Sequence, residues 1–205
     1  MKTRNTLLVM AVLLFASAMQ SAAKDEMDEV FSSLKKKYKE IKSIELQFHR
    51  NGDGVAGTLK AKTGQKYFLD MKDRAIICNG KTIWNYSKRD KSVVISNYEG
   101  DKPQMSIEEF FFSFLDNYQP AEIKQIGNGE DNSGYLLTLK PSAEANAQYK
   151  EVKLKIDTAS SIKHVEVTTD SGTEGWEIKK LLTKKLSDKI FEFTPPDNTQ
   201  VIDLR

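Results

Sequence analysis

The chain has 205 residues, with two histidines, one cysteine, and 31 Lys and Arg against 29 Asp and Glu. This length suits one large domain or two small ones. The near-neutral charge disfavours a nucleic-acid-binding protein, which would usually carry a basic excess. The single cysteine, Cys78, excludes an internal disulfide.

Residues 1–23 are typical of a cleaved secretory signal. Lys2 and Arg4 form a basic start, an apolar stretch follows over residues 7–18, and three small residues precede position 24. About 12 apolar residues are too few for a membrane span, which needs roughly 20, and no Cys follows that could carry a lipid anchor. We therefore expect an exported chain of residues 24–205, folded as one domain because it contains no repeat or flexible linker.

A helix with one apolar face is predicted over residues 25–41. Its apolar side chains recur at spacings of three and four, while lysines 35–37 and 39 occupy the opposite face. The apolar positions are Met27, Val30, Phe31, Leu34, Tyr38 and Ile41. Such a helix needs an apolar surface to pack against.

Short β-strands with alternating side chains follow this helix. The predicted strands cover residues 44–48, 57–62, 67–71, 75–78, 82–86, 93–96, 121–126, 135–139, 152–156, 162–168 and 175–182, with a last strand that ends at Pro195. About ten short strands favour a strongly curved antiparallel sheet, because open twisted sheets of that size tend to curl.

The pair Asn79-Gly80 lies between two of these strands and predicts a tight hairpin. In the second arm Trp84 and Tyr86 point to the same face, because side chains alternate along a strand. Two large aromatic side chains on one face need a cover.

A second helix is predicted over residues 106–115. Residues Ser106 to Glu109 form a capping box, in which the Ser and Glu side chains satisfy free backbone N–H groups. Apolar side chains then follow at helical spacing: Ile107, Phe110, Phe111, Phe114 and Leu115. The pattern fits either an ordinary core helix or a lid.

Catalytic and metal-binding motifs are not found in the sequence. Gly80-Lys81-Thr82 imitates the end of a phosphate-binding loop, but it lies in a hairpin and position 75 is Ala instead of Gly. The two histidines, His49 and His164, have no partner at metal-ligand spacing. We expect no enzyme activity, no metal and no cofactor; a hydrolase using Cys78 or His49 is the minor alternative.

Several segments combine into a pattern with a known counterpart. They are Phe48, Gly57-Thr58-Leu59 with Lys62, Tyr67-x-Leu69, Asn79-Gly80-Lys81-Thr82-Ile83-Trp84-x-Tyr86, and Phe191-x-Phe193-x-Pro195-Pro196 followed by Val201-x-Asp203. Together they resemble the LolA family, periplasmic carriers that move lipoproteins from the inner to the outer membrane of Gram-negative bacteria. The resemblance covers nearly the whole mature chain.

This resemblance implies an α+β fold, an unclosed (half) antiparallel β-barrel with a helical lid over an apolar cavity. The lid residues it implies are Phe31, Leu34 and Thr63. The lipid-binding residues it implies are Leu46, Phe48, Leu59, Tyr67, Leu69, Met71, Trp84, Tyr86, Ile107, Phe110, Phe111 and Phe114. Each of these side chains also suits an ordinary core.

The function implied is that of a periplasmic carrier that binds the acyl chains of lipoproteins and shuttles them between membranes. Its partners would be the lipoproteins, an inner-membrane lipoprotein-releasing ABC transporter and an outer-membrane acceptor lipoprotein. A monomer suits such a shuttle. The alternative is a periplasmic sensor or adaptor of the same fold that recognises lipid or lipoprotein without shuttling it.

The sequence departs from the family pattern at two places. Thr63-Gly64 stands where the family commonly has Arg-Pro, and in the family that arginine ties the lid to the barrel. Leu69 stands where the family often has Trp. We expect the fold to survive both changes, with lid closure either weaker or dependent on other contacts.

Overall fold

The computed structural model describes residues 24–99, 114–127, 133–143, 145, 147 and 149–205. Within these ranges an N-terminal helix covers residues 24–39, which confirms the first predicted helix. The second predicted helix lies mostly outside the described residues, and with it Ile107, Phe110 and Phe111. Its end, Phe114–Asn117, forms a short 3-10 helix, η2.

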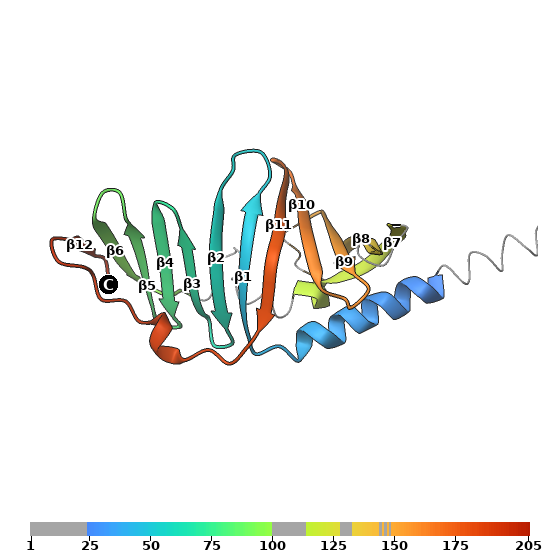
Figure 1. Cartoon of the computed structure of the whole chain (residues 1–205), viewed down its shortest axis with the longest axis horizontal. Helices are drawn as coiled ribbons and strands as arrows, with labels where there is room; N and C mark the ends of the chain where they lie inside the picture. The colour runs from blue at the N-terminus through green and yellow to red at the C-terminus, as the bar shows by residue number, and fades with distance from the viewer. Residues whose placement is uncertain (1–23, 100–113, 128–132, 144, 146, 148) are drawn as a thin grey trace, which may run out of the picture.

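One sheet contains all twelve strands of the described residues. The strands are β1 (Ser43–Arg50), β2 (Ala56–Lys62), β3 (Lys66–Met71), β4 (Arg74–Asn79), β5 (Thr82–Ser87), β6 (Ser92–Asn97), β7 (Tyr118–Ile126), β8 (Gly134–Pro141), β9 (Glu151–Asp157), β10 (Ile162–Thr169), β11 (Gly172–Thr183) and β12 (Gln200–Asp203). Their order is β12-β6-β5-β4-β3-β2-β1-β11-β10-β9-β8-β7. The sheet is unclosed, because the end strands β12 and β7 do not pair with each other (Figure 1).

The end of the chain differs from the sequence prediction. The strand expected to end at Pro195 is absent there, and η3 (Asp188–Phe191) stands in its place, capped by the Ser187 side chain, which accepts a bond from the Lys189 N–H. The last strand, β12, comes later and pairs with β6 in parallel, so the expectation of a purely antiparallel sheet is wrong at this pair. The predicted strand rested on the alternation of Phe191 and Phe193, which is typical of a strand.

The predicted hairpin joins β4 to β5. Its two loop residues are Gly80 and Lys81, one position later than the predicted pair. The Asn79 side chain accepts bonds from the N–H groups of Lys81 and Thr82, at 3.0 and 2.9 Å. Gly80 has φ +89°, and a Cβ there would lie 2.6 Å from the Gly64 carbonyl oxygen, so only glycine fits without a shift.

The larger apolar core lies on one face of the sheet, which we name the inner face. The register aligns Leu46 with Leu59 and Leu137 with Leu154, and β10 adds Val165 to the same cluster. The N-terminal helix packs against this face through Phe31, Leu34, Tyr38 and Ile41, and η2 adds Phe114 and Leu115. The apolar stripe of the helix therefore finds its partner here.

A second, smaller core lies on the opposite face of β4 to β6, which we name the outer face. Ile77 aligns with Trp84, and Trp84 aligns with Ile95, in one row across the three strands. The C-terminal segment, residues 184–199, supplies the cover: Phe193 stacks on Tyr86 with ring centroids 5.3 Å apart. The two aromatic side chains of the hairpin are thus covered by the tail of the chain.

Candidate functional site

The inner face brings together the predicted site residues of the first three strands. Leu46, Leu59 and Leu69 align directly across β1, β2 and β3. Next to this row, Phe48 aligns with Gly57, where a Cβ would come within 2.8 Å of the Phe48 ring. The glycine therefore makes room for the aromatic ring, as in other sheets where an aromatic covers a glycine. Tyr67 and Met71 occupy the same face of β3, by register with Ala61 and Gly57.

The structure separates Trp84 and Tyr86 from that set. Leu69 aligns with Ile76, so the neighbouring Ile77 and its partner Trp84 point to the outer face. The alternation within the hairpin was correct. The face of the whole sheet on which Trp84 and Tyr86 lie depends on how β3 pairs with β4. The sequence of the hairpin alone does not contain that information.

Much of the inner face comes from strands whose side chains the sequence analysis left unassigned. These residues include Leu137, Leu139, Val152, Leu154, Ile156, Ile162, Val165, Val167, Ile178 and Leu181. The sequence signal for these residues was the alternation of apolar and polar side chains along β8 to β11. The missing step was the long-range pairing of β1 with β11, which places both halves of the sheet side by side.

The predicted lid residues fall into two groups. Phe31 and Leu34 lie on the buried face of the N-terminal helix, with exposed fractions of 8% and 0%. Thr63 lies instead just after β2, half-buried, where its backbone N–H donates to the Lys42 carbonyl oxygen at 3.0 Å. Thr63 is thus placed in a turn, apart from the helix that covers the inner face.

A small apolar cavity lies between the cover and the inner face. Its lining consists of Tyr38, Leu46, Phe114, Ile162, Val165, Ile178 and Leu181. The cavity measures about 20 Å³, which is room for roughly one water molecule. The described residues therefore leave little free space at this apolar place, and a long ligand fits there only if the surrounding side chains move.

Tyr38 brings a polar group to this cavity from the helix. Its side chain is 3% exposed, and its hydroxyl oxygen accepts a bond from the Ile162 N–H at 3.2 Å. Burial raises the pKa of Tyr38 to about 12, because the phenolate would lose its hydration.

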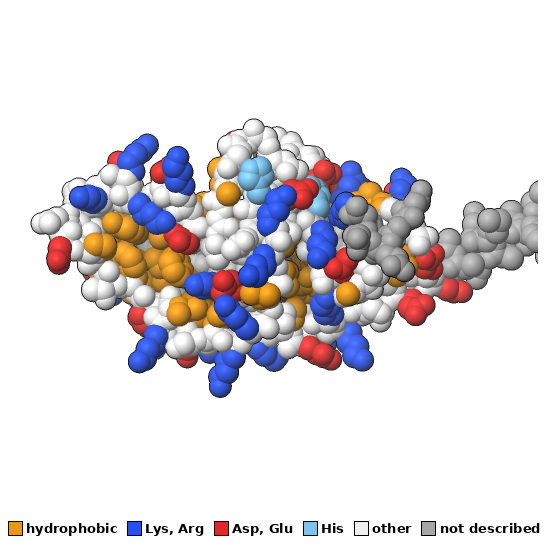
Figure 2. Space-filling model, viewed as in Figure 1, with side chains coloured by type: hydrophobic (Ala, Val, Ile, Leu, Met, Phe, Trp, Pro, Cys, Tyr) orange, Lys and Arg blue, Asp and Glu red, His pale blue; other side chains and the backbone are white. Residues whose placement is uncertain are grey.

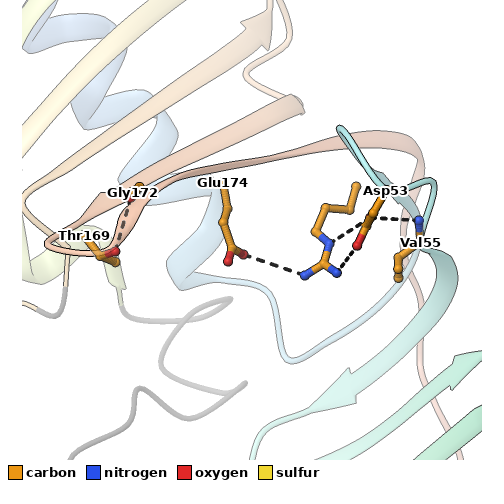
Figure 3. Close-up of polar contacts among 6 residues, drawn as sticks. Asp53, Val55, Thr169, Gly172 and Glu174 are labelled. Atoms are coloured by element: carbon orange, nitrogen blue, oxygen red, sulfur yellow. Dashed lines mark hydrogen bonds and ion pairs between the residues drawn. The ribbon is translucent and has the colours of Figure 1, made fainter.

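A polar depression lies at one end of the sheet, between the β1–β2 and β10–β11 turns. There Arg50 pairs with Asp53 and lies 3.9 Å from Glu174, while Asp53 also accepts a bond from the Val55 N–H at 3.1 Å (Figure 3). The bond from Arg50 holds the pKa of Asp53 below its usual value. In the second turn the Thr169 hydroxyl donates to the Gly172 carbonyl oxygen (Figure 3). These groups satisfy one another and fix the turns.

Reactive groups are few in the part of the chain that the structure describes. Cys78 is a fully buried free cysteine, and burial raises the pKa of its thiol, which disfavours the thiolate that a nucleophile requires. The described ranges hold no group of three side chains suited to a metal ion. His164 instead pairs with Glu177, with Nδ1 3.2 Å from the carboxylate.

The molecular surface mixes both signs of charge. Figure 2 shows Lys and Arg side chains spread over one whole face, interspersed with Asp and Glu, and apolar side chains gathered over the strands at its left. No single-sign field of the kind that binds nucleic acid is visible on this face, as far as the described residues cover it. Among the described residues, no helix is both long and apolar enough to cross a membrane.

Comparison with known families decides the affiliation. The family model for "Outer membrane lipoprotein carrier protein LolA" matches residues 47–194, well over half of the chain. The chain belongs to the LolA family. The family takes its name from a carrier of outer-membrane lipoproteins. No curated protein sequence matches the chain at a significant level.

Solved structures resemble this LolA family member in fold at low sequence identity. An uncharacterized conserved protein from Thermus thermophilus is 11% identical with a TM-score of 0.55, over 86% of this chain and 98% of that chain. LprF from Mycobacterium bovis is 8% identical with a TM-score of 0.47, over 85% and 98%. MucB of Pseudomonas aeruginosa, in its complex with MucA, is 10% identical with a TM-score of 0.42, over 82% and 61%. The first of these supports the open-sheet fold.

Proposed function

We propose that this LolA family member is a periplasmic carrier that holds the acyl chains of lipoproteins between the inner face and its helical cover. It would move them from the inner to the outer membrane. The observation that carries the proposal is the wholly apolar cavity between Tyr38, Phe114 and the sheet. Family membership supplies the cargo class.

The small cavity fits a handover mechanism. Each CH₂ group withdrawn from water contributes about 0.8 kcal/mol, so a chain of about fifteen carbons gains on the order of 12 kcal/mol. Such a chain would be held too tightly unless opening the cover offset part of the gain. A cover that closes to about 20 Å³ when empty provides that offset. Closure then helps to expel the cargo at its destination.

The proposed lipid-binding surface is the inner face alone. It comprises the cavity lining and the adjoining row of Leu46, Leu59 and Leu69. We leave out Trp84 and Tyr86, because the outer face packs them against the C-terminal segment. Two apolar side chains of β11 separate the faces: Ile178 belongs to the inner core, while Leu182 aligns with Glu45 and is 37% exposed on the outer face.

The remaining parts of the proposal rest on the predicted export signal and on the family resemblance. Residues 1–23 act as the cleaved signal, residues 24–205 form one monomeric domain, and the protein works in the periplasm without a cofactor. Its partners are an inner-membrane lipoprotein-releasing ABC transporter, which loads it, and an outer-membrane acceptor lipoprotein, which unloads it.

A binding experiment tests the site. The mature protein is titrated with a fluorescent fatty acid, and the Ile178→Gln variant is compared with its matched control Leu182→Gln. We expect one saturable site per chain, an affinity about tenfold lower in Ile178→Gln and wild-type affinity in Leu182→Gln, because only the first position meets the acyl chain. Equal loss in both variants contradicts an inner-face site.

A release experiment tests the carrier role. Inner-membrane vesicles that contain labelled lipoprotein and an energised ABC transporter are incubated with the mature protein, and the supernatant is assayed. A soluble one-to-one complex supports carriage. Lipid binding without release from any transporter tested contradicts carriage and leaves a sensor or adaptor.

A further inference from the structure

Two neighbouring side chains of the N-terminal helix reach the turn between β9 and β10. The Lys37 ammonium donates to the Ala159 carbonyl oxygen at 2.7 Å and to the Ser161 hydroxyl oxygen at 2.8 Å. One residue on, the Tyr38 hydroxyl accepts the Ile162 N–H at 3.2 Å. The helix is thus hydrogen-bonded to two residues of a turn that lies far away in sequence and to the first residue of β10.

The shape of this turn is held by hydrogen bonds and an ion pair that do not involve the helix. The Asp157 carboxylate accepts bonds from the N–H groups of Ala159 and Ser161, at 3.0 and 2.7 Å, and pairs with Lys163 at 3.0 Å. Burial alone would raise the pKa of Asp157, but these donors lower it below its usual value. A turn fixed by its own carboxylate loses little conformational entropy when the helix docks.

Tyr38 connects this turn to the cavity. Its ring lines the cavity together with Leu46 and Phe114, while its hydroxyl meets the first residue of β10. A chain that enters the cavity by displacing the Tyr38 ring would separate its hydroxyl from the Ile162 N–H. The buried N–H then has no partner unless water enters, which makes the contact costly to break.

The polar contact of the helix with η2 is weaker. Lys35 pairs with Asp116 at 2.8 Å, but the two side chains are 35% and 56% exposed. Exposed ion pairs of this kind contribute little. Of the contacts with the β9–β10 turn, the Tyr38 bond to Ile162 is buried, the Lys37 bond to Ser161 is partly buried and the Lys37 bond to Ala159 is exposed, so the Tyr38 bond contributes most to the polar attachment of the helix.

We propose that the β9–β10 turn is the latch that holds the N-terminal helix closed over the inner face. This inference rests on the carrier function proposed above and names how its cover is held. Acyl-chain entry opens the latch, and delivery lets it close.

The latch is tested first without any lipid. Hydrogen exchange of the mature protein is compared with that of the double variant Lys37→Met, Tyr38→Phe, which keeps the apolar parts of both side chains. The matched control is Lys36→Met, an exposed lysine of the same helix. We expect amides of residues 24–39 to exchange about tenfold faster in the double variant, with β8 to β10 unchanged and the control like wild type.

Two results overturn the latch. Wild-type exchange in the double variant shows that the contacts do not hold the helix. Equal loss of protection in the helix and the sheet shows that the helix is an inseparable part of the core.

Fatty-acid titration of the same variants separates the latch from the carrier function. We expect about tenfold tighter binding in the double variant and no change in Lys36→Met, because a weaker latch lowers the cost of opening. If the helix exchanges faster in the double variant but no variant binds lipid, the latch is supported and the carrier function is refuted. If all variants bind lipid equally and the helix of the double variant exchanges as in wild type, the carrier function is supported and the latch is refuted.

Discussion

The two faces of the sheet carry cores that differ in how they are closed. The inner core is covered by the start of the chain, through an apolar helix stripe, a small cavity and hydrogen bonds from Lys37 and Tyr38 to a distant turn. The outer core is covered by the end of the chain, where the partly buried rings of Phe193 and Tyr86 pack together and the fully buried Phe191 lies nearby in η3. We propose that the cover of the inner face is removable and that the cover of the outer face is permanent.

The permanent cover depends on apolar burial. Phe191 has no exposed surface, and η3, which contains it, lies against β3 and β4. The ion pairs beside it, from Lys62 and Lys66 to Asp188, involve an aspartate that is 60% exposed, so they add little.

The largest effect is expected for the permanent cover. Phe191→Ala should lower the free energy of unfolding by about 3–5 kcal/mol, as for other fully buried phenylalanines, measured by urea denaturation. Val201→Ala, at a half-exposed position of the same tail, should change it by less than about 0.5 kcal/mol. A loss under about 1 kcal/mol for Phe191→Ala contradicts the permanent cover.

The removable cover should respond to alkaline pH. The pKa of Tyr38 is raised from 10.0 to about 12, so its contribution to stability is fully present below pH 10 and is lost as the pH rises through about 12. Two pKa units correspond to about 3 kcal/mol at most. Wild type should lose stability between about pH 10 and pH 12 more steeply than Tyr38→Phe, as measured by thermal unfolding. Parallel pH profiles for the two proteins contradict this contribution.

The hairpin under the outer core gives a smaller effect. Gly80→Ala should cost about 1–3 kcal/mol, because it adds strain at positive φ to a contact with the Gly64 carbonyl oxygen. Gly54→Ala shares a positive φ but meets nothing within 4 Å, so it should cost less. The measurement is the free energy of unfolding of the two variants in chemical denaturation. Equal losses in both variants would contradict the close contact at Gly80.

The smallest effect is expected at the polar end of the sheet. Asp53→Asn removes the partner of Arg50, yet the Asp53 side chain is solvent-exposed, so the free energy of unfolding should not change measurably. Fatty-acid affinity should not change at all, because neither core includes this pair. A clear drop in affinity places the lipid at this end of the molecule and contradicts the inner-face site.

Local patterns were enough to predict most elements of the fold. The spacing from Phe31 to Ile41 predicted the first helix, and Asn79-Gly80 predicted the hairpin to within one residue. Long-range pairing was not predictable in the same way. The parallel addition of β12 to β6, and the 3-10 turn that replaces a strand at Phe191, depend on contacts with strands about 100 residues earlier.

The candidate site was predictable only in part, for the same reason. Leu46, Leu59 and Leu69 were placed correctly on one face, because they lie on consecutive strands joined by short turns. Trp84 was assigned to that face by resemblance alone, and the register puts it on the other. The Lys37 and Tyr38 contacts join residues far apart in sequence, so no local pattern indicates them.

Photo-crosslinking with a diazirine-labelled fatty acid tests the central claim most directly, because it reports which face the lipid touches. We expect saturable labelling on the inner face, in peptides containing Leu46, Val165 and Ile178, together with the N-terminal helix. Labelling confined to the outer face around Trp84 and Tyr86 would show that the removable and permanent covers have been assigned to the wrong faces.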